Sequence, residues 1–296
     1  MLTAKENLRE VVRGGKPDRF VNQYEAIQLL FNPFLMHNPS PAPGQENVVN
    51  AWGVTNSFPK GTPGSFPVHT PDKIVVKDIE DWKSVVKAPS LKFAQSEWDI
   101  FKAQYDAVDG KLAYKAAFIA PGLFEQTHHL CEITNALMYY ITDPDEMHDL
   151  VKYLTEWELR LAEGICSHLH PDAVFHHDDW GSETSTFLRP EMFADFFLEP
   201  YKEIYKYYHD HGVELVIHHS DSYAATLVPY MIEMGVDIWQ GCMRSNDVPE
   251  LVRKYGGRIS FMGGIDNKCV DFDGWTDEDC RKAAQEVCDA CGPNYF

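Results

Sequence analysis

The sequence predicts an α/β protein built as one (β/α)8 TIM-like barrel, and two observations carry that prediction. From Ala113 onward, short apolar segments alternate regularly with longer helical ones, a pattern typical of a parallel sheet with right-handed crossovers. The number of such units favours a closed barrel over an open sheet. Four of the apolar segments end in polar residues, and because chemistry in parallel α/β folds lies at the carboxyl ends of strands, one shared site is expected there.

Composition supports a large globular core and excludes two classes of partner. The chain has 296 residues, of which 44% are hydrophobic and 24% charged, enough for one barrel-sized domain. Its net charge of −19 repels phosphate backbones and anionic lipid, so neither nucleic acid nor membrane is an expected partner. The N-terminus lacks a signal peptide's apolar core. The seven cysteines show no disulfide-scaffold spacing and are interpreted as reduced thiols of a cytoplasmic protein.

The N-terminal part begins with a helix and then changes character. A capping box at Thr3–Glu6 starts an amphipathic helix that Gly14 and Gly15 stop, and a first strand is predicted near Phe20–Tyr24. Residues 31–73 are rich in Pro and Gly, with aromatic residues between them. They form either an exposed insertion or a loop layer over the barrel mouth, and a strand pair is expected within Val48–Ser57.

Caps and breakers define the remaining elements. Asp143-Pro144 and Pro190 mark helix starts, and Gly212, Gly235 and Gly256 mark helix ends. The predicted helices cover Ser96–Val108, Glu125–Tyr140, Asp143–His168, Pro190–Gly212, Tyr223–Met234, Val248–Tyr255 and Asp277–Ala290. The predicted strands between them begin at Leu112, Ala173, Val213, Asp237 and Ile259. A further strand is expected to begin at Asn294, so a full barrel would continue past Phe296, and the single domain 1–296 is expected to be truncated at its C-terminus.

Six motifs occur in a fixed order between residues 174 and 266. They are Phe175–Ser182, Leu188–Phe193, Pro200–Lys202, His219–Asp221, Leu227–Asp237 and Phe261–Asp266. In this order they resemble the uroporphyrinogen decarboxylase (URO-D) superfamily. The resemblance implies a TIM-like barrel with its site in the C-terminal mouth.

The resemblance is closer to one of the superfamily's two main branches. True uroporphyrinogen decarboxylases carry Arg-Gln-Ala-Gly-Arg after the first strand, whereas this chain has the arginine-free stretch Asn22–Gln28. The other branch comprises the cobalamin (corrinoid)-dependent methyltransferases, whose zinc sites use His-x-Cys-Gly at a strand end. The aligned residues here are His219-Ser-Asp-Ser222. The resemblance thus implies zinc, and it implies a corrinoid carried by a separate protein, because the chain has no cobalamin-binding Asp-x-His-x-x-Gly motif.

His219 and Asp221 form the central candidate site. They lie two residues apart on a strand end, so their side chains face the same way. Imidazole and carboxylate are acceptable zinc ligands that leave a position open for substrate, and the metal would polarise an ether or hydroxyl oxygen. Alternatively, the aspartate orients a catalytic histidine without metal. Candidates for a third ligand are His177, Glu183, Cys242 and Asp266.

Asp178 and Asp179 are predicted to be catalytic with His219. Neighbouring carboxylates raise the pKa of one of them, which makes a proton donor near neutral pH. Adjacent strand residues face opposite ways, so at least one carboxylate is expected in the mouth, and one of His176 and His177 behind the strand. The pair His128-His129 is interpreted as helix packing. The expected substrate-binding residues are Trp52, His177, Trp180, Trp239, Gly264 and Asp266.

The sequence therefore predicts a cytoplasmic methyltransferase. It would move a methyl group between a small methylated substrate, for example a methyl ether in an O-demethylation, or a thiol, and a separate corrinoid protein. One alternative is URO-D-type decarboxylation of a tetrapyrrole. A second is a non-catalytic tetrapyrrole-binding barrel, although buried polar strand ends are costly in a protein without a reaction to perform.

Overall fold

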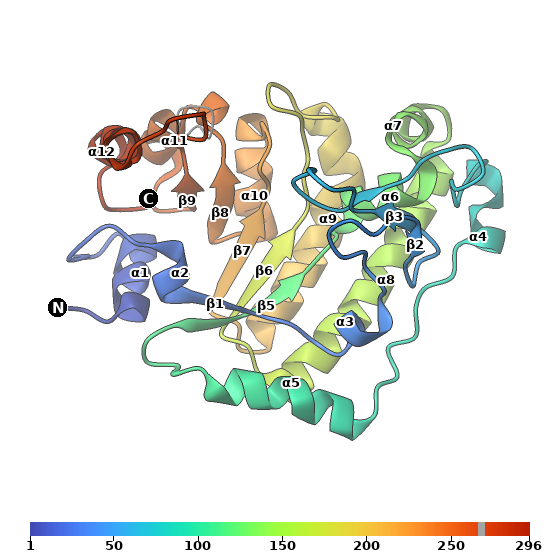
Figure 1. The fold of residues 1–296 in the computed structure, drawn as a ribbon, viewed down its shortest axis with the longest axis horizontal. Coiled ribbons are helices and arrows are strands. Elements are labelled where there is room, and N and C mark those ends of the chain that lie inside the picture. Colours follow the sequence, from blue (N-terminus) through green and yellow to red (C-terminus); the bar gives the residue numbers. More distant parts are fainter. Residues whose placement is uncertain (266–269) are drawn as a thin grey trace.

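The computed structural model describes residues 1–265 and 270–296, and its centre is a six-stranded parallel sheet (Figure 1). The strand order is β1-β5-β6-β7-β8-β9. These strands are β1 (Ile27–Leu30), β5 (Tyr114–Ile119), β6 (Ala173–His177), β7 (Leu215–His219), β8 (Ile238–Cys242) and β9 (Ser260–Gly263). Because all neighbouring pairs are parallel, the carboxyl ends of the six strands lie along the same edge of the sheet.

Helices connect the strands, and those that follow β5 to β8 cover the outer face of the sheet, whereas α1 (Ala4–Arg13) packs on its inner side (Figure 1). The longer ones are α1, α5 (Gln95–Ala107), α6 (Leu123–Cys131), α7 (Ile133–Thr142), α8 (Pro144–Leu169), α9 (Pro190–Asp210), α10 (Val228–Met234), α11 (Val248–Tyr255) and α12 (Asp277–Cys291). Short turns of helix are α2 (Gln23–Ala26), α3 (Phe34–His37), α4 (Trp82–Val85), η1 (Ile79–Asp81), η2 (Ala225–Leu227) and η3 (Arg244–Asn246).

Two apolar cores lie on opposite sides of the sheet. Strand residues that face the helices, such as Val174 and Val216, join the large core around α8 and α9. Their neighbours along the strands, such as Phe175 and Ile217, face the inner side and form a smaller core with Leu8 of α1. This alternation decides which polar residues at the strand ends reach the mouth.

The predicted closed barrel is seen in part, as six parallel strands. Within residues 1–265 and 270–296, β1 and β9 each pair with one neighbour and not with each other. Tyr295 contacts β9 and α1. Its carbonyl accepts the N–H of Phe261 in β9 at 2.8 Å, and its own N–H donates to the carbonyl of Val11 in α1 at 3.1 Å. The strand expected at Asn294 is thus reduced to isolated contacts.

Two predicted elements differ from the structure for local reasons. The strand predicted at Phe20–Tyr24 begins instead at Ile27, because the Asn22 side chain accepts the N–H of Tyr24 and starts the helical turn α2. The single helix predicted over Glu125–Tyr140 is two helices. Glu132 interrupts it with a φ of 72°, and its carboxylate then caps α7. That break ends α6 beside the mouth.

The loop layer, residues 31–73, has its own antiparallel sheet and packs on the barrel. Its strands are β2 (Val48–Val49), β3 (Thr55–Ser57) and β4 (Phe66–Pro67). The rings of Trp52 and Phe34 each meet Trp157 of α8 edge-on at 5.0 Å. His69 Nε2 donates to the carbonyl of His129 in α6 at 3.1 Å. The layer therefore contacts two of the helices that surround the mouth.

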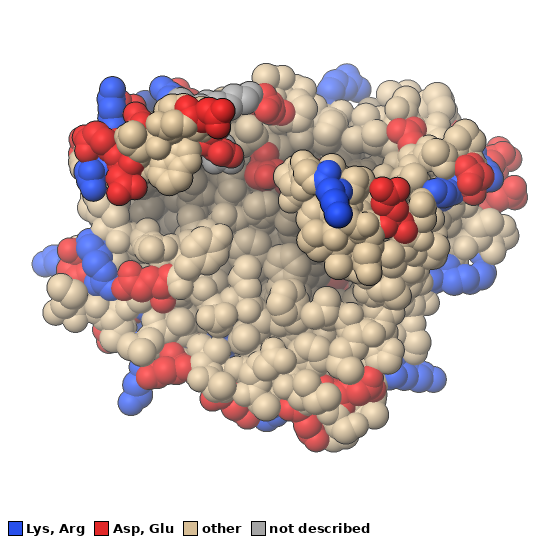
Figure 2. All heavy atoms as spheres, viewed as in Figure 1, with Lys and Arg blue, Asp and Glu red and all other residues tan. Residues whose placement is uncertain are grey.

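Charged side chains gather around the rim of the face seen in Figure 1, and uncharged residues fill its hollowed middle (Figure 2). No helix in the described part of the chain combines the length and the hydropathy needed to cross a bilayer.

Candidate active site

Three metal-ligating side chains meet where β6 and β7 end. His177 is in register with His219, and the two imidazole rings stack with centroids 4.5 Å apart. One ligand atom from each of His177, Asp179 and His219 lies within 4.8 Å of the others, and all three residues are half-buried. Two imidazoles and one carboxylate are a ligand set that zinc accepts with positions left open, so the residues present fit a zinc ion.

Neighbouring side chains orient both imidazoles. His219 donates its Nδ1–H to Oε1 of Gln240 on β8, and Gln240 Nε2 in turn donates to Gln23 Oε1 at 3.0 Å. His177 donates its Nδ1–H to Oε2 of Glu125 on α6 at 2.9 Å. Each hydrogen bond leaves the Nε2 lone pair of its imidazole available, which is the usual arrangement around a histidine that binds a metal.

Burial and close contact between charged groups shift the pKa values of four side chains in and around the cluster. Burial and the neighbouring His177 lower the pKa of His219, although its hydrogen bond to Gln240 acts to raise this pKa. Burial also lowers the pKa of His177, but Glu125 and Asp179 outweigh it and raise this pKa to about 9. Burial raises the pKa of Glu125 to about 7. Burial and the adjacent Asp179 raise the pKa of Asp221 to about 6.

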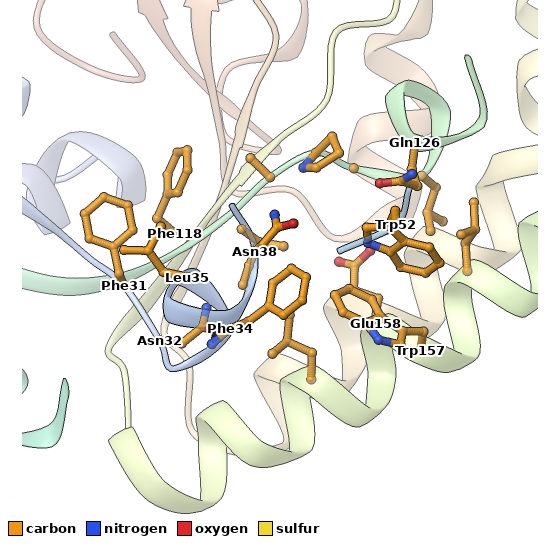
Figure 3. A pocket seen from close by; sticks show the side chains of 17 residues that line it. Phe31, Asn32, Phe34, Leu35, Asn38, Trp52, Phe118, Gln126, Trp157 and Glu158 are labelled. Atoms are coloured by element: carbon orange, nitrogen blue, oxygen red, sulfur yellow. Dashed lines mark hydrogen bonds between the residues drawn. The ribbon is translucent and has the colours of Figure 1, made fainter. Parts of the chain in front are cut away.

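A small cavity of about 90 Å³ opens beside this cluster, at the ends of β1 and β5. Five aromatic side chains contribute to its lining, and Figure 3 shows Trp52 and Phe34 of the loop layer together with Trp157 and Glu158 of α8. Successive ring contacts of 5.6, 6.0 and 5.7 Å run from Phe31 through Phe118 and Phe175 to His219. An apolar wall therefore connects the cavity to the metal-ligating cluster.

Comparison with known proteins supplies the family. Residues 48–295 match the sequence profile of the family described as Uroporphyrinogen decarboxylase (URO-D). The chain belongs to the URO-D family. Among 16 matching chains of solved structures is a methyltransferase from Methanosarcina mazei, which is 13% identical with a TM-score of 0.65 over 98% of this chain and 90% of that one. At this identity the likeness shows the fold alone. No curated protein matches the sequence.

In this URO-D family member, Asp178 points away from the mouth and not into it. Its carboxylate accepts the N–H groups of Phe124 at 3.0 Å and Glu125 at 2.7 Å, in the first turn of α6. It also accepts Trp180 Nε1–H at 2.8 Å and the Tyr201 hydroxyl. Four donors on a fully buried carboxylate make it an anchor for α6. Asp179 is the carboxylate of the predicted pair that groups with His177 and His219, since adjacent strand-end residues face opposite ways.

Four other predicted residues lie outside the cluster. Trp180 stacks on His218 in the outer core at 3.9 Å. Trp239 is buried there too, and its Nε1–H donates to the carbonyl of Ser220 at 3.0 Å. Burial raises the pKa of the Cys242 thiol, which donates to the carbonyl of Trp239 at 3.3 Å and is thereby a poor metal ligand. Glu183 is exposed in the loop after β6.

The remaining predicted residues have mixed outcomes. Asp221 lies beside the cluster: it is exposed, and its backbone N–H donates to Asp179 Oδ1 at 2.9 Å. Trp52 lines the small cavity. Gly264 lines a separate cavity between α11 and α12, and its N–H donates to the carbonyl of Cys242 at 2.6 Å. Asp266 lies outside the described residues.

Sequence reasoning missed Gln240 and Glu125, and it did not group Glu125 with His128 and His129, which lie close together in the structure. Gln240 is a neutral residue on β8 without a motif around it. Glu125 precedes the two histidines by three and four residues, a spacing that places all three on one helix face. That spacing was the available signal, but the pair was interpreted as packing.

The orienting role of Gln240 gives a first prediction. Replacing Gln240 with leucine removes the acceptor of His219 Nδ1–H, so the imidazole loses its fixed tautomer and orientation. We expect zinc affinity to fall about 10–100-fold in competition titrations with a chromogenic chelator. Gln23→Leu, one hydrogen bond further out, should have a smaller effect. Equal affinity in wild type and the Gln240 variant would contradict the orienting role.

Proposed function

We propose that this URO-D family protein transfers a methyl group from a small methyl ether to a corrinoid carried by a separate protein, at a zinc site formed by His177, Asp179 and His219. The observation that carries the proposal is the convergence of these three ligands at the ends of β6 and β7, within 4.8 Å. Zinc bound there would supply Lewis-acid polarisation of the ether oxygen. Family membership and the fold shared with a methyltransferase support an enzyme of this class.

The ligand chemistry favours an oxygen substrate over a thiol. The cluster offers two imidazoles and a carboxylate and no thiolate among the described residues. Thiolate ligands donate more charge to zinc and suit softer partners, whereas nitrogen and oxygen ligands leave it a harder acid. Ether and hydroxyl oxygens are hard donors, so the set matches them better.

The chain's own residues would then hold the substrate and supply a proton. In an ether demethylation the carbon–oxygen bond breaks, a reduced corrinoid supplies the electron pair that takes the methyl group, and the released alkoxide needs one proton. Asp221 holds a pKa of about 6 beside the cluster, which suits a proton donor near neutral pH. The aromatic cavity would hold the rest of a small substrate and exclude water.

The proposal is tested with zinc-loaded protein, reduced corrinoid and a panel of methyl ethers that includes methoxylated aromatics. Methyl transfer changes the corrinoid absorption spectrum, so the reaction is followed directly. We expect zinc-dependent transfer from at least one ether and none after chelation. In a parallel assay, thiols are incubated with methylated corrinoid and the transfer of the methyl group to the thiol is measured. Transfer to thiols alone would reject the ether assignment, and no transfer in either arm would reject the function.

The main alternative is decarboxylation of a porphyrinogen, and we expect none. Asn22–Gln28, which takes the place of the arginine-rich signature, forms α2 and the start of β1 and carries no arginine. A substrate with many carboxylates would lack its cationic partners there. Incubation with uroporphyrinogen should leave it unchanged by chromatography. Formation of coproporphyrinogen at an ordinary enzymatic rate would overturn the expectation. The non-catalytic alternative fails if either reaction is observed. A cytoplasmic location remains part of the proposal, in line with the cysteine pattern.

A further inference from the structure

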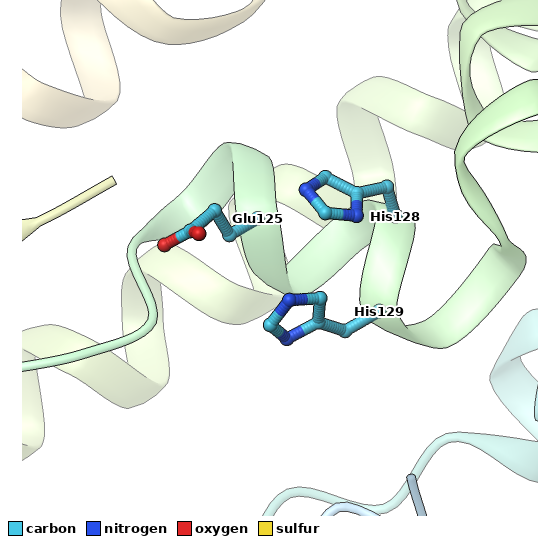
Figure 4. A group of neighbouring side chains, drawn as sticks. All are labelled: Glu125, His128 and His129. Atoms are coloured by element: carbon cyan, nitrogen blue, oxygen red, sulfur yellow. The ribbon is translucent and has the colours of Figure 1, made fainter. Parts of the chain in front are cut away.

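A second group of metal-ligating side chains lies on α6, next to the strand-end cluster. Glu125, His128 and His129 occupy one face of the helix, at positions i, i+3 and i+4. One ligand atom from each lies within 4.8 Å of the others, and Figure 4 shows the three side chains projecting from α6 on the same side. The two imidazole rings are nearly perpendicular, at 89°, with centroids 4.8 Å apart.

The ring nitrogens of this group lack partners in the protein. None of the four nitrogens of His128 and His129 makes a hydrogen bond within residues 1–265 and 270–296, although both residues are half-buried. Glu125 uses only Oε2, for His177, so its Oε1 is also left without a hydrogen bond to the described chain. These atoms are not fully enclosed by the protein, so an ion from solvent can reach them. One ligand atom from each of the three residues is close enough to the others for all three to bind a single ion.

Structure around the group holds it in place. The start of α6 is fixed by Asp178, which accepts the N–H of Glu125. The loop layer reaches the end of the same helix through His69, which bonds the carbonyl of His129. The ligand positions are therefore set by the barrel on one side and by the layer on the other, as expected of a preorganised site.

We propose that Glu125, His128 and His129 bind a second divalent transition-metal ion of the zinc class. Two histidines and one glutamate are a known zinc donor set. Glu125 would then contribute one oxygen to this ion while its other oxygen orients His177 of the strand-end site. Glu125 would thus link the two sites, so binding of an ion at one site would change the affinity of the other site for its ion. The site concerns metal binding and does not depend on methyl transfer.

The test counts bound metal. Protein stripped with a chelator is titrated with Zn²⁺ and then assayed by elemental analysis after gel filtration. We expect about two equivalents in wild type and about one in the His128→Ala/His129→Ala double variant. The His219→Ala variant should keep the α6 ion and lose the strand-end ion. His211→Ala removes an exposed histidine on α9's C-terminal side and should keep two equivalents.

A spectroscopic readout separates ligand loss from misfolding. Co²⁺ in place of Zn²⁺ gives visible absorption bands that depend on its ligands, and the α6 variant should lose one of two sets of bands. Since the imidazoles of His128 and His129 make no hydrogen bonds to the described chain, and the substitutions leave the helix backbone in place, the metal-free variant should melt within a few degrees of metal-free wild type. One equivalent in wild type, with the same count and the same Co²⁺ spectrum in the α6 variant, would overturn the second site.

Discussion

Replacing His219 with alanine should remove zinc from the strand-end site and lower methyl transfer by about 10²–10⁴-fold, because the lost Lewis acid contributes several kcal/mol to the barrier. The effect should be on chemistry and not on folding. The inner core beneath the site consists of apolar strand residues such as Phe175 and Ile217, which the substitution leaves in place. Circular dichroism and the melting temperature of the metal-free protein should therefore match wild type.

The two aspartates beside His219 provide a matched comparison. Asp179 groups with His177 and His219, and Asp221 is exposed beside them, whereas the motif alone pointed to Asp221. Asp179→Ala should lose zinc as fully as His219→Ala, and Asp221→Ala should retain most of it. Zinc content and the rate of corrinoid methylation are measured on all three variants. Zinc loss in Asp221→Ala but not in Asp179→Ala would reverse the assignment.

Replacing Asp178 with alanine should produce the largest loss of stability among the strand-end residues. The change removes the acceptor of two N–H groups at the start of α6 and leaves the Trp180 indole and the Tyr201 hydroxyl unpaired in the core. A lost helix cap and buried unpaired donors together cost about 2–4 kcal/mol, or roughly 5–10 °C in melting temperature.

Asp179→Ala is the control for this prediction, because it removes a carboxylate one residue away that has no buried donors to satisfy. Thermal melts of the metal-free proteins, followed by circular dichroism, compare the two. Equal melting temperatures for wild type and Asp178→Ala would show that the Asp178 carboxylate does not anchor α6.

Much of the architecture followed from the sequence, because caps and apolar runs are local signals. Alternation from Ala113 onward predicted β5 to β9 and the helices between them, and the Asp143-Pro144 start of α8 is where the cap placed it. The first strand was predicted a few residues too early, because Asn22 caps the helical turn α2 and the strand begins only after that turn, at Ile27. Whether the sheet closes depends on long-range contacts between β1 and β9, which no local pattern encodes.

The site was predictable in location but not in detail. Parallel strands bring their carboxyl ends together, so His177 and His219 could be placed near each other from their strands alone. The alternation of side chains along a strand predicted that one of Asp178 and Asp179 faces the mouth. Choosing between them required the position of α6, because the N–H groups of its first turn bind the Asp178 carboxylate. Glu125 and Gln240 come from other elements, and their contacts with the two histidines arise only from tertiary packing.

The position of the site within the sheet has a consequence for its dynamics. β6 and β7 each have a hydrogen-bonded strand on both sides, whereas β1 and β9 have one. Opening of a strand at the margin breaks one ladder, but opening of β6 or β7 breaks two and also disturbs both apolar cores. Amide hydrogens of Phe175 and Ile217 should therefore exchange with deuterium much more slowly than those of Leu29 and Met262. His177 and His219 lie on β6 and β7, so their spacing should persist while the margins of the sheet fluctuate.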